Sequence, residues 1–174
     1  GISEAAVQSF VAAERERFLA RNPKSLALAE RARHSLFGGV PMHWMNDWSM
    51  PSALFVSHAQ GSRFHDVDGH EYIDFCLGDT GSMFGHSPAP IARALAEQGA
   101  RGLTTMLPGE DAVVAGELLA ERFGLPFWQV ATTATDANRY VIRWARAITN
   151  RKMLLVFDGC YHGTVDDVMV RHQE

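Results

Sequence analysis

The sequence predicts an α/β protein in which N-terminal helices and a small antiparallel meander precede the start of a larger α/β domain. Three patterns along the 174 residues indicate this fold class. Apolar residues recur at helical spacing over residues 3–20, period-two alternation occupies residues 54–75, and a strand, helix, strand order begins near residue 127. The last order is the unit of a doubly wound sheet. We expect one domain over residues 1–80 and the incomplete beginning of a second over residues 81–174.

Two helices are expected at the N-terminus. The first ends at Asn22-Pro23, because proline lacks the backbone donor that a continuing helix needs. The second runs until Phe37-Gly38-Gly39, where two glycines follow the last periodic residue. The next stretch, residues 40–51, is aperiodic and rich in aromatic residues. It is either a loop whose aromatic side chains pack on a core or part of a substrate pocket.

Three short strands are expected between residues 54 and 75, at 54–56, 63–66 and 71–75. The dipeptide Asp68-Gly69 is expected to form a tight type I′ turn between the last two, because both central positions of that turn need positive φ. The remaining elements are expected in this order: a helix after His86-Ser87-Pro88, a loop over 99–108, a helix over 110–122 that buries Val113, Val114, Leu118 and Leu119, a strand over 127–131, a helix over 136–148, and a fully buried strand over 153–157.

Composition excludes several classes of function. The net charge is −4 and no cluster of Lys and Arg is present, so binding to nucleic acid or to an anionic membrane is not expected. The apolar runs are far shorter than the roughly 20 residues that span a bilayer. Cys76 and Cys160 show no C-x-x-C spacing, which predicts no metal site and favours a reducing, cytoplasmic location. A hydrolase is disfavoured because no G-x-S-x-G elbow follows a strand.

Two loops could hold a ligand. The turn over residues 132–136 follows an expected strand and opens a helix, so its free backbone N–H groups could bind a phosphate. Thr and Asp are also ordinary capping residues that need no ligand. The loop over residues 159–163 follows the next expected strand and should lie at the same edge of the sheet. Tyr161 could stack on a flat ring there, or pack on its neighbours, and His162 could be a histidine with its hydrogen bonds satisfied.

Four segments carry a resemblance to a known family: residues 61–75, 85–88, 133–138 and 161–163. In this order and spacing they resemble the class III aminotransferases of pyridoxal-phosphate (PLP) fold type I, which include glutamate-1-semialdehyde aminomutase and β-amino-acid transaminases. The resemblance implies PLP as cofactor and transfer of an amino group between a small-molecule donor and a keto acceptor. It does not distinguish transaminase, aminomutase and racemase. It also implies a homodimer, with residues 102–106 as a candidate interface segment.

The resemblance implies a cofactor site in two loops, made of Thr133, Ala134, Thr135, Tyr161, His162 and Gly163. The first three match a Ser-Gly-Thr that holds the phosphate, so the Thr135 hydroxyl and the N–H groups of Ala134 and Thr135 are the expected ligands. Tyr161 matches the residue stacked on the pyridine ring, and the two residues after it are expected to shape the ring pocket. The sequence departs from the family at Ala134, where glycine is usual, and at Asp136, where glutamate is usual.

Two further expectations concern substrate and chemistry. Some β-amino-acid transaminases place an arginine in the loop after the second helix, whereas this loop has none over residues 39–44, so His43 and Trp44 become substrate-pocket candidates with core packing as the alternative. The only lysines, Lys24 and Lys152, match no catalytic position of the family. No catalytic residue is therefore expected in this chain, and the Schiff-base lysine is expected beyond Glu174. The chain alone would then be inactive, or would be a non-catalytic fragment or phosphate-ligand binding module.

Overall fold

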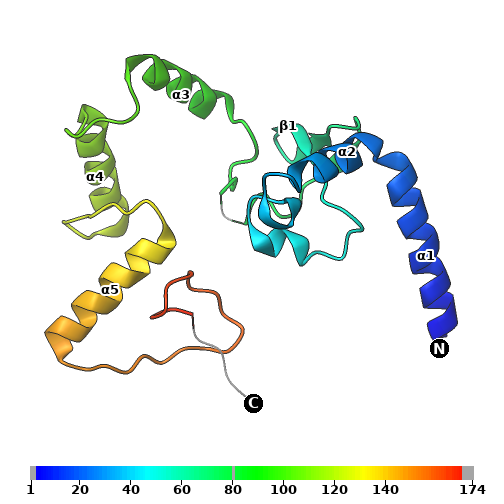
Figure 1. Cartoon of the computed structure of the whole chain (residues 1–174). Helices are drawn as coiled ribbons and strands as arrows, with labels where there is room; N and C mark the ends of the chain where they lie inside the picture. The colour runs from blue at the N-terminus through cyan, green and yellow to red at the C-terminus, as the bar shows by residue number, and fades with distance from the viewer. Residues whose placement is uncertain (1–2, 80, 170–174) are drawn as a thin grey trace. The chain divides into compact units, whose positions relative to one another are not determined.

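The computed structural model describes residues 3–79 and 81–169. The chain divides into two compact units, residues 1–104 and residues 105–174, which are described separately (Figure 1). Thr80, at the predicted domain boundary, lies outside the described residues, and that boundary stays a prediction. Within the described part, no helix has the length and apolar composition needed to cross a membrane.

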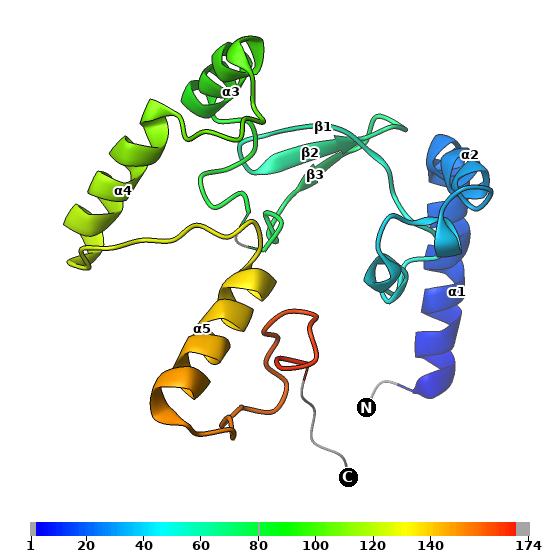
Figure 2. The ribbon, with the colours of Figure 1, turned by 60° about the vertical axis from the view of Figure 1, so that its left-hand side comes forward.

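The N-terminal helices of the first unit are those that the sequence predicts. Helix α1 spans Glu4–Arg21 and begins where the Ser3 hydroxyl accepts a hydrogen bond from Ala6 N at 3.3 Å. Asn22 ends it, and its side-chain amide donates to the carbonyl of Phe18 at 2.8 Å. Helix α2 follows α1 directly in the chain (Figure 2). It spans Pro23–Ala32 with the proline at its first position, where a missing N–H costs nothing. The predicted break at Asn22-Pro23 is confirmed.

Two short 3-10 helices follow α2 among the described residues. The first, η1, spans Phe37–Gly39 and precedes the aromatic stretch, and the second, η2, spans His43–Asn46 within it. Gly38 and Gly39 both have positive φ, so this turn uses the backbone freedom of two adjacent glycines. The prediction that the second helix stops before them is confirmed, and the stretch over residues 40–51 contains one helical turn, η2, that its aperiodic sequence does not indicate.

The predicted meander is present as a three-stranded antiparallel sheet in the order β1-β2-β3. The strands are β1 Val56–Gln60, β2 Arg63–Asp66 and β3 Glu71–Ile73, so β1 lies mostly after the predicted residues 54–56. The expected type I′ turn is wrong. Four residues connect β2 to β3, the turn closes through Gly69 N to Asp66 O at 3.2 Å, and Gly69 has positive φ whereas Asp68 does not.

Asp68 instead caps helix α2 from the meander. Its two carboxylate oxygens accept hydrogen bonds from Lys24 N at 2.8 Å and Ser25 N at 2.9 Å. These are orphan donors of the first helical turn, and a negative charge is favoured at that end of the helix dipole. Burial raises the pKa of Asp68, but the hydrogen bonds from Lys24 and Ser25 outweigh it and hold the pKa below its usual value. The turn residue therefore joins the sheet to the helices.

Two more carboxylates organise the sheet. Asp66 is 1% exposed and accepts from His70 N at 2.8 Å, His70 Nδ1 at 2.9 Å and the Tyr72 hydroxyl at 3.0 Å. Burial alone would raise the pKa of Asp66, but the hydrogen bonds from these donors lower it. Burial and the hydrogen bond to Asp66 both raise the pKa of Tyr72. Asp74 bonds to His86 Nε2 at 2.7 Å, and this contact is the main reason that the pKa of Asp74 is lowered.

These lowered pKa values predict a loss of stability in acid. Carboxylates that bind protons less readily when folded contribute stability above their unfolded pKa of about 4, and this contribution disappears as the pH falls through the folded values. We expect Asp68→Asn to be less stable than the unsubstituted protein at pH 7, and the difference to shrink progressively below about pH 4. Urea unfolding at pH 7, 5, 4 and 3 measures it. A difference that widens as the pH falls would contradict this assignment.

Helix α3 spans Ala89–Arg101, after the predicted His86-Ser87-Pro88 start. It runs through Gly99, so the predicted loop begins only at Gly102, whose φ is 105°. The chain just before this helix is joined to the turn between β1 and β2 by two backbone hydrogen bonds between Gly61 and His86, at 2.9 and 2.8 Å. The start of this helix follows the predicted proline, whereas its end lies at Gly102 rather than before Gly99.

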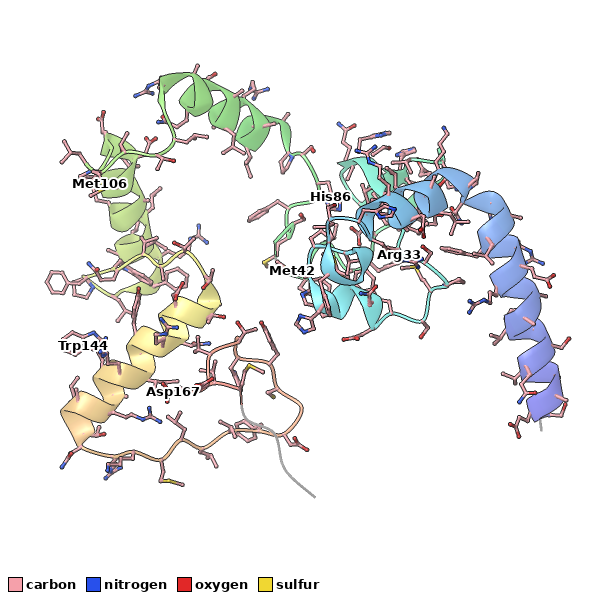
Figure 3. All side chains as sticks on the ribbon, in the orientation of Figure 1. Arg33, Met42, His86, Met106, Trp144 and Asp167 are labelled. Atoms are coloured by element: carbon pink, nitrogen blue, oxygen red, sulfur yellow. The ribbon has the colours of Figure 1, made fainter. Side chains whose placement is uncertain are left out.

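The second unit contains α4, Glu110–Phe123, and α5, Ala134–Thr149. Gly124 ends α4 in the left-handed conformation, as its sequence position predicts. The predicted burial of the α4 apolar face is wrong: Val113, Val114 and Leu118 are exposed in the described structure, and Leu119 is only half-buried. The side chain of Trp144 likewise projects uncovered from α5 (Figure 3).

The two strands predicted in this unit are not formed among the described residues. Residues 127–131 and 153–157 lack strand pairing, and Phe127, Met153 and Leu155 are each 90% exposed. A strand is defined by hydrogen bonds to a neighbouring strand, and a strand buried on both faces also needs covering layers. Apolar composition indicates that a segment is suited to such a position and cannot supply the neighbours.

Candidate functional site

The candidate site lies at the start of helix α5 in the second unit. Thr133 is the residue before the helix, with an extended backbone, and its hydroxyl accepts a hydrogen bond from Asp136 N at 3.1 Å. The same hydroxyl donates to Asp136 Oδ2 at 2.9 Å. Both roles of this hydroxyl are therefore occupied in shaping the turn, as in an ordinary helix cap.

The next two residues leave backbone donors available. Ala134 and Thr135 are the first two helical residues, and helix geometry gives their N–H groups no acceptor within the helix. No described residue accepts a hydrogen bond from either group. The positive end of the helix dipole lies at the same place. This turn can therefore hold an anion.

The loop over residues 159–163 meets this turn, as the sequence predicts. Thr164 N donates to Thr135 Oγ1 at 3.3 Å, which uses the acceptor side of that hydroxyl and leaves its hydrogen available to donate. Gly163 is buried with φ 113°, and a Cβ there would lie 2.5 Å from Thr135 Oγ1 and 3.0 Å from Thr135 Cα. Only glycine fits this approach. The two loops converge, although the sheet edge that was expected to align them is not formed in the described part of the chain.

A residue that the sequence analysis did not single out completes the contact. Asn138, half-buried on α5, donates from Nδ2 to the carbonyl of His162 at 2.8 Å. Its place three residues after Thr135 was the available signal, because side chains at that spacing share one face of a helix. The ring of Tyr161 is 79% exposed directly before the bonded segment.

The donor set suits a phosphate ester that carries a flat ring. Two N–H groups and one hydroxyl hydrogen can point at phosphate oxygens, and the charge of the helix end has the right sign. Ala134 carries a methyl group where the family has glycine, but the donors at this turn remain available. The neighbouring aromatic side chain of Tyr161 has its faces open for stacking. These residues fit such a group in both charge and shape.

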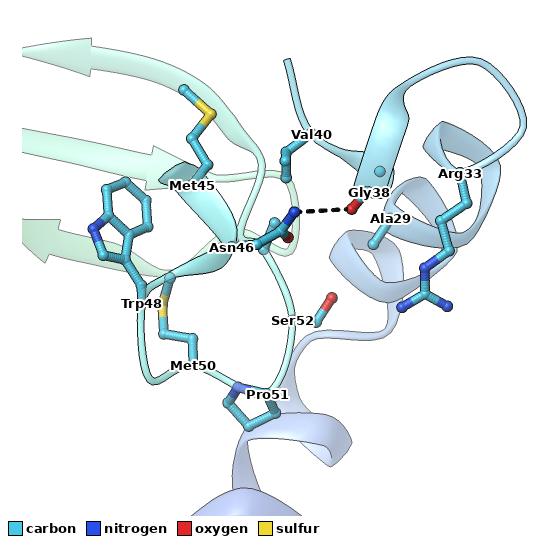
Figure 4. Close-up of a pocket in the computed structure, with 12 residues that line it drawn as sticks. Ala29, Arg33, Gly38, Val40, Met45, Asn46, Trp48, Met50, Pro51 and Ser52 are labelled. Atoms are coloured by element: carbon cyan, nitrogen blue, oxygen red, sulfur yellow. Dashed lines mark hydrogen bonds between the residues drawn. The ribbon is translucent and has the colours of Figure 1, made fainter. Parts of the chain in front are cut away.

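His43 and Trp44 lie in the first unit, on η2. Trp44 packs edge-on against Trp48 with ring centroids 5.5 Å apart. A pocket of about 170 Å³ opens nearby, bounded by the end of α2, the glycine turn and the chain from Met45 to Ala53 (Figure 4). Neither His43 nor Trp44 is among the residues that line it. Packing on a core and a substrate role both remain predictions for these two residues.

Residues 44–173 match the family described as aminotransferase class III. The chain belongs to the class III aminotransferases. Its resemblance to that family is thereby confirmed across most of its length. Within the described residues, no group of three or more metal-ligating side chains is assembled.

The class III relatives that this chain matches are much longer than the chain itself. A glutamate-1-semialdehyde 2,1-aminomutase 2 of Exiguobacterium sibiricum is 33% identical over 154 residues, which are 87% of this chain and 35% of that protein. This class III chain therefore spans about a third of the length of such relatives.

Solved structures of aminomutases and aminotransferases resemble this chain in fold. A glutamate-1-semialdehyde aminomutase from Pseudomonas aeruginosa PAO1 superposes with a TM-score of 0.92 at 44% identity, covering 99% of this chain and 38% of that one, and a variant of it was solved in complex with PMP. A β-phenylalanine aminotransferase from Variovorax paradoxus has a TM-score of 0.84 at 27% identity, covering 92% of this chain and 37% of that one. The expected fold class is confirmed: mixed helices and a small antiparallel sheet, with fold type I aminotransferases as structural neighbours.

Proposed function

We propose that the protein transfers an amino group, with PLP as cofactor, between an amino acid or amine and a keto acid or aldehyde. The observation that carries the proposal is the close approach of Gly163 to Thr135. It brings the loop over residues 159–163, called here the ring-binding loop, to the anion-binding turn at residues 133–135. Membership of the class III family and the PMP complex of a structural neighbour support the same cofactor. When bound, PLP supplies the electron sink for the transfer.

The chain's own residues would bind and orient the cofactor. The N–H groups of Ala134 and Thr135 and the Thr135 hydroxyl would hold the phosphate, while Thr133 would keep the turn in shape. The ring of Tyr161 would cover one face of the pyridine, with His162 and Gly163 forming the wall beside it. Holding both ends of the cofactor fixes the direction in which its reactive carbon faces.

Neither lysine of the chain matches the position at which the family links PLP. In the second unit, Arg146 Nε donates to the carbonyl of Lys152 at 3.1 Å, which anchors Lys152 at the far end of α5. Thr135 and Arg146 are eleven residues apart on that helix, which corresponds to roughly 16 Å at 1.5 Å per residue. Lys152 is therefore not proposed as the residue that links PLP. Lys24 belongs to the first unit, where its backbone N–H donates to Asp68.

A non-catalytic phosphate-ligand module is the second candidate function, because the described site offers donors and a ring but no amine. The colour of the sample and its reaction with borohydride distinguish the aminotransferase from the binding module. A yellow sample whose visible absorption is removed by borohydride with covalent retention of the cofactor would show a lysine linkage. Retention of PLP by a sample that borohydride leaves unlinked would favour the binding module.

The proposed homodimer depends on the segment over residues 102–106. Leu103, Met106 and Leu107 are exposed apolar side chains at this point of the chain. Such side chains in series are typical of surfaces that associate. We propose that this segment contributes to contact between two copies, and sedimentation of a Met106→Glu variant would test it.

Thr135→Ala is expected to weaken PLP retention by about 10-fold or more, because one hydrogen bond to a charged oxygen is worth about 1.5–3 kcal/mol. Thr135→Ser keeps the hydroxyl and should retain most of the affinity. Equilibrium dialysis with PLP measures both. Thr149→Ala, which removes a hydroxyl bonded to Ala145 O at 2.7 Å near the other end of the same helix, is the matched control. Unchanged retention in Thr135→Ala would remove this hydroxyl from the site.

A further inference from the structure

One face of α5 holds three consecutive residues, His162 and Gly163 at the end of the loop over residues 159–163 and Thr164 directly after it. Asn138 Nδ2 donates to His162 O at 2.8 Å, Gly163 packs directly on Thr135, and Thr164 N donates to Thr135 Oγ1 at 3.3 Å. Thr135 and Asn138 are three residues apart, so both project from the same face of the helix. The backbone of residues 162–164 is therefore clamped by two side chains.

The shorter of the two hydrogen bonds belongs to Asn138. It is part-buried, whereas the bond at Thr135 is exposed and longer. A hydrogen bond shielded from water holds geometry more firmly than an exposed one. The bond also ties down the carbonyl of His162, which is next to Tyr161 in sequence. Asn138 is thus the contact best placed to determine the path of the chain at Tyr161.

Packing does not hold the ring of Tyr161, since that side chain is 79% exposed. Its position relative to the phosphate-binding N–H groups depends on the backbone that precedes His162. The helix that presents those N–H groups is the same helix that carries Asn138. One rigid element can therefore set the distance between the phosphate site and the stacking ring.

We propose that Asn138 is a positioning residue that places Tyr161 over the pyridine ring of PLP while the start of α5 holds the phosphate. The inference rests on the proposed function and deepens it. It separates two contributions to affinity: the phosphate contacts, which Asn138 does not touch, and the ring contact, which acts through the loop. If Asn138 only stabilised the fold, its substitution would weaken the phosphate contacts and the ring contact together.

The test substitutes leucine for Asn138. Leucine has nearly the shape of asparagine and is also uncharged, but it lacks the amide donor. We expect the Kd for PLP to rise about 10-fold, while the Kd for inorganic phosphate changes less than about 2-fold. In a double-mutant cycle, Asn138→Leu should add little to Tyr161→Ala, because both remove the same ring contact. Asn22→Leu is the matched control: it breaks another 2.8 Å amide-to-carbonyl bond, in the first unit, and should leave both Kd values unchanged.

Thermal unfolding of each variant establishes that it is folded, and Asn138→Ser, which is smaller and polar, is the second variant with the same expected direction. Equal losses of PLP and phosphate affinity, no loss of PLP affinity, or effects fully additive with Tyr161→Ala would each overturn the positioning role. A folded, unsubstituted protein that binds no PLP would overturn the proposed function itself, and this inference with it.

Discussion

Gly163→Ala is expected to separate the ring-binding loop from α5 and to cost about 3 kcal/mol of loop stability, or about 100-fold in PLP affinity. The added Cβ would lie 2.5 Å from Thr135 Oγ1 and 3.0 Å from Thr135 Cα. The hydroxyl could rotate away, but the helix backbone cannot. The φ of 113° adds strain for any residue with a Cβ, so two independent costs act at one position.

Gly102→Ala distinguishes these two costs. Gly102 has a similar φ, 105°, and a Cβ there would meet nothing within 4 Å. This variant should lose only the backbone contribution, about 1 kcal/mol, and should keep its PLP affinity. Dialysis against PLP and urea unfolding measure the two effects. If both alanine variants behaved alike, the close approach of loop and helix would not control the site.

Asp66→Ala should lower the free energy of unfolding by about 3–5 kcal/mol. The carboxylate is 1% exposed and accepts three hydrogen bonds, two from His70 and one from Tyr72. Its removal leaves these donors with no acceptor and opens a space that water does not reach freely. Asp66→Asn should rescue little, because the amide presents donors of its own to groups that already donate.

The comparison variant is Glu71→Ala in the adjacent strand. Glu71 pairs with Arg63 and lies 3.4 Å from His65, on a face where about half of its side chain is exposed. Exposed ion pairs contribute below about 1 kcal/mol, so its loss should be small. Urea midpoints at pH 7 compare both variants with the unsubstituted protein. Similar losses would mean that the Asp66 contacts are not what stabilises the sheet.

Much of the first unit was predictable because the signals are local. Asn22-Pro23 ends a helix through the chemistry of proline itself, and alternation over residues 63–73 marks strands that pair with their nearest neighbours in sequence. The Asp68 cap was not predictable. Its partners Lys24 and Ser25 lie more than forty residues away, and the turn chemistry of Asp68-Gly69 pointed to another role.

The candidate site shows the same division. The motif around Thr133 to Thr135 and the loop at Tyr161 could be found in the sequence, because capping hydroxyls and glycines leave recognisable patterns. The prediction of strands over residues 127–131 and 153–157 was wrong for the described structure, because apolar composition cannot provide a hydrogen-bonding neighbour. Asn138 was missed because an asparagine inside a helix has no distinctive pattern until its acceptor is known.

By itself, the sequence determined the class III family, the helix boundaries near Asn22 and Gly124, the meander and the two loops of the candidate site, because each depends on residues close together along the chain. Only the tertiary structure decided that Gly163 touches Thr135 and that Asn138 holds the loop. Those contacts join residues more than twenty positions apart. The backbone path that brings such residues together is a property of the folded chain, and no local pattern encodes it.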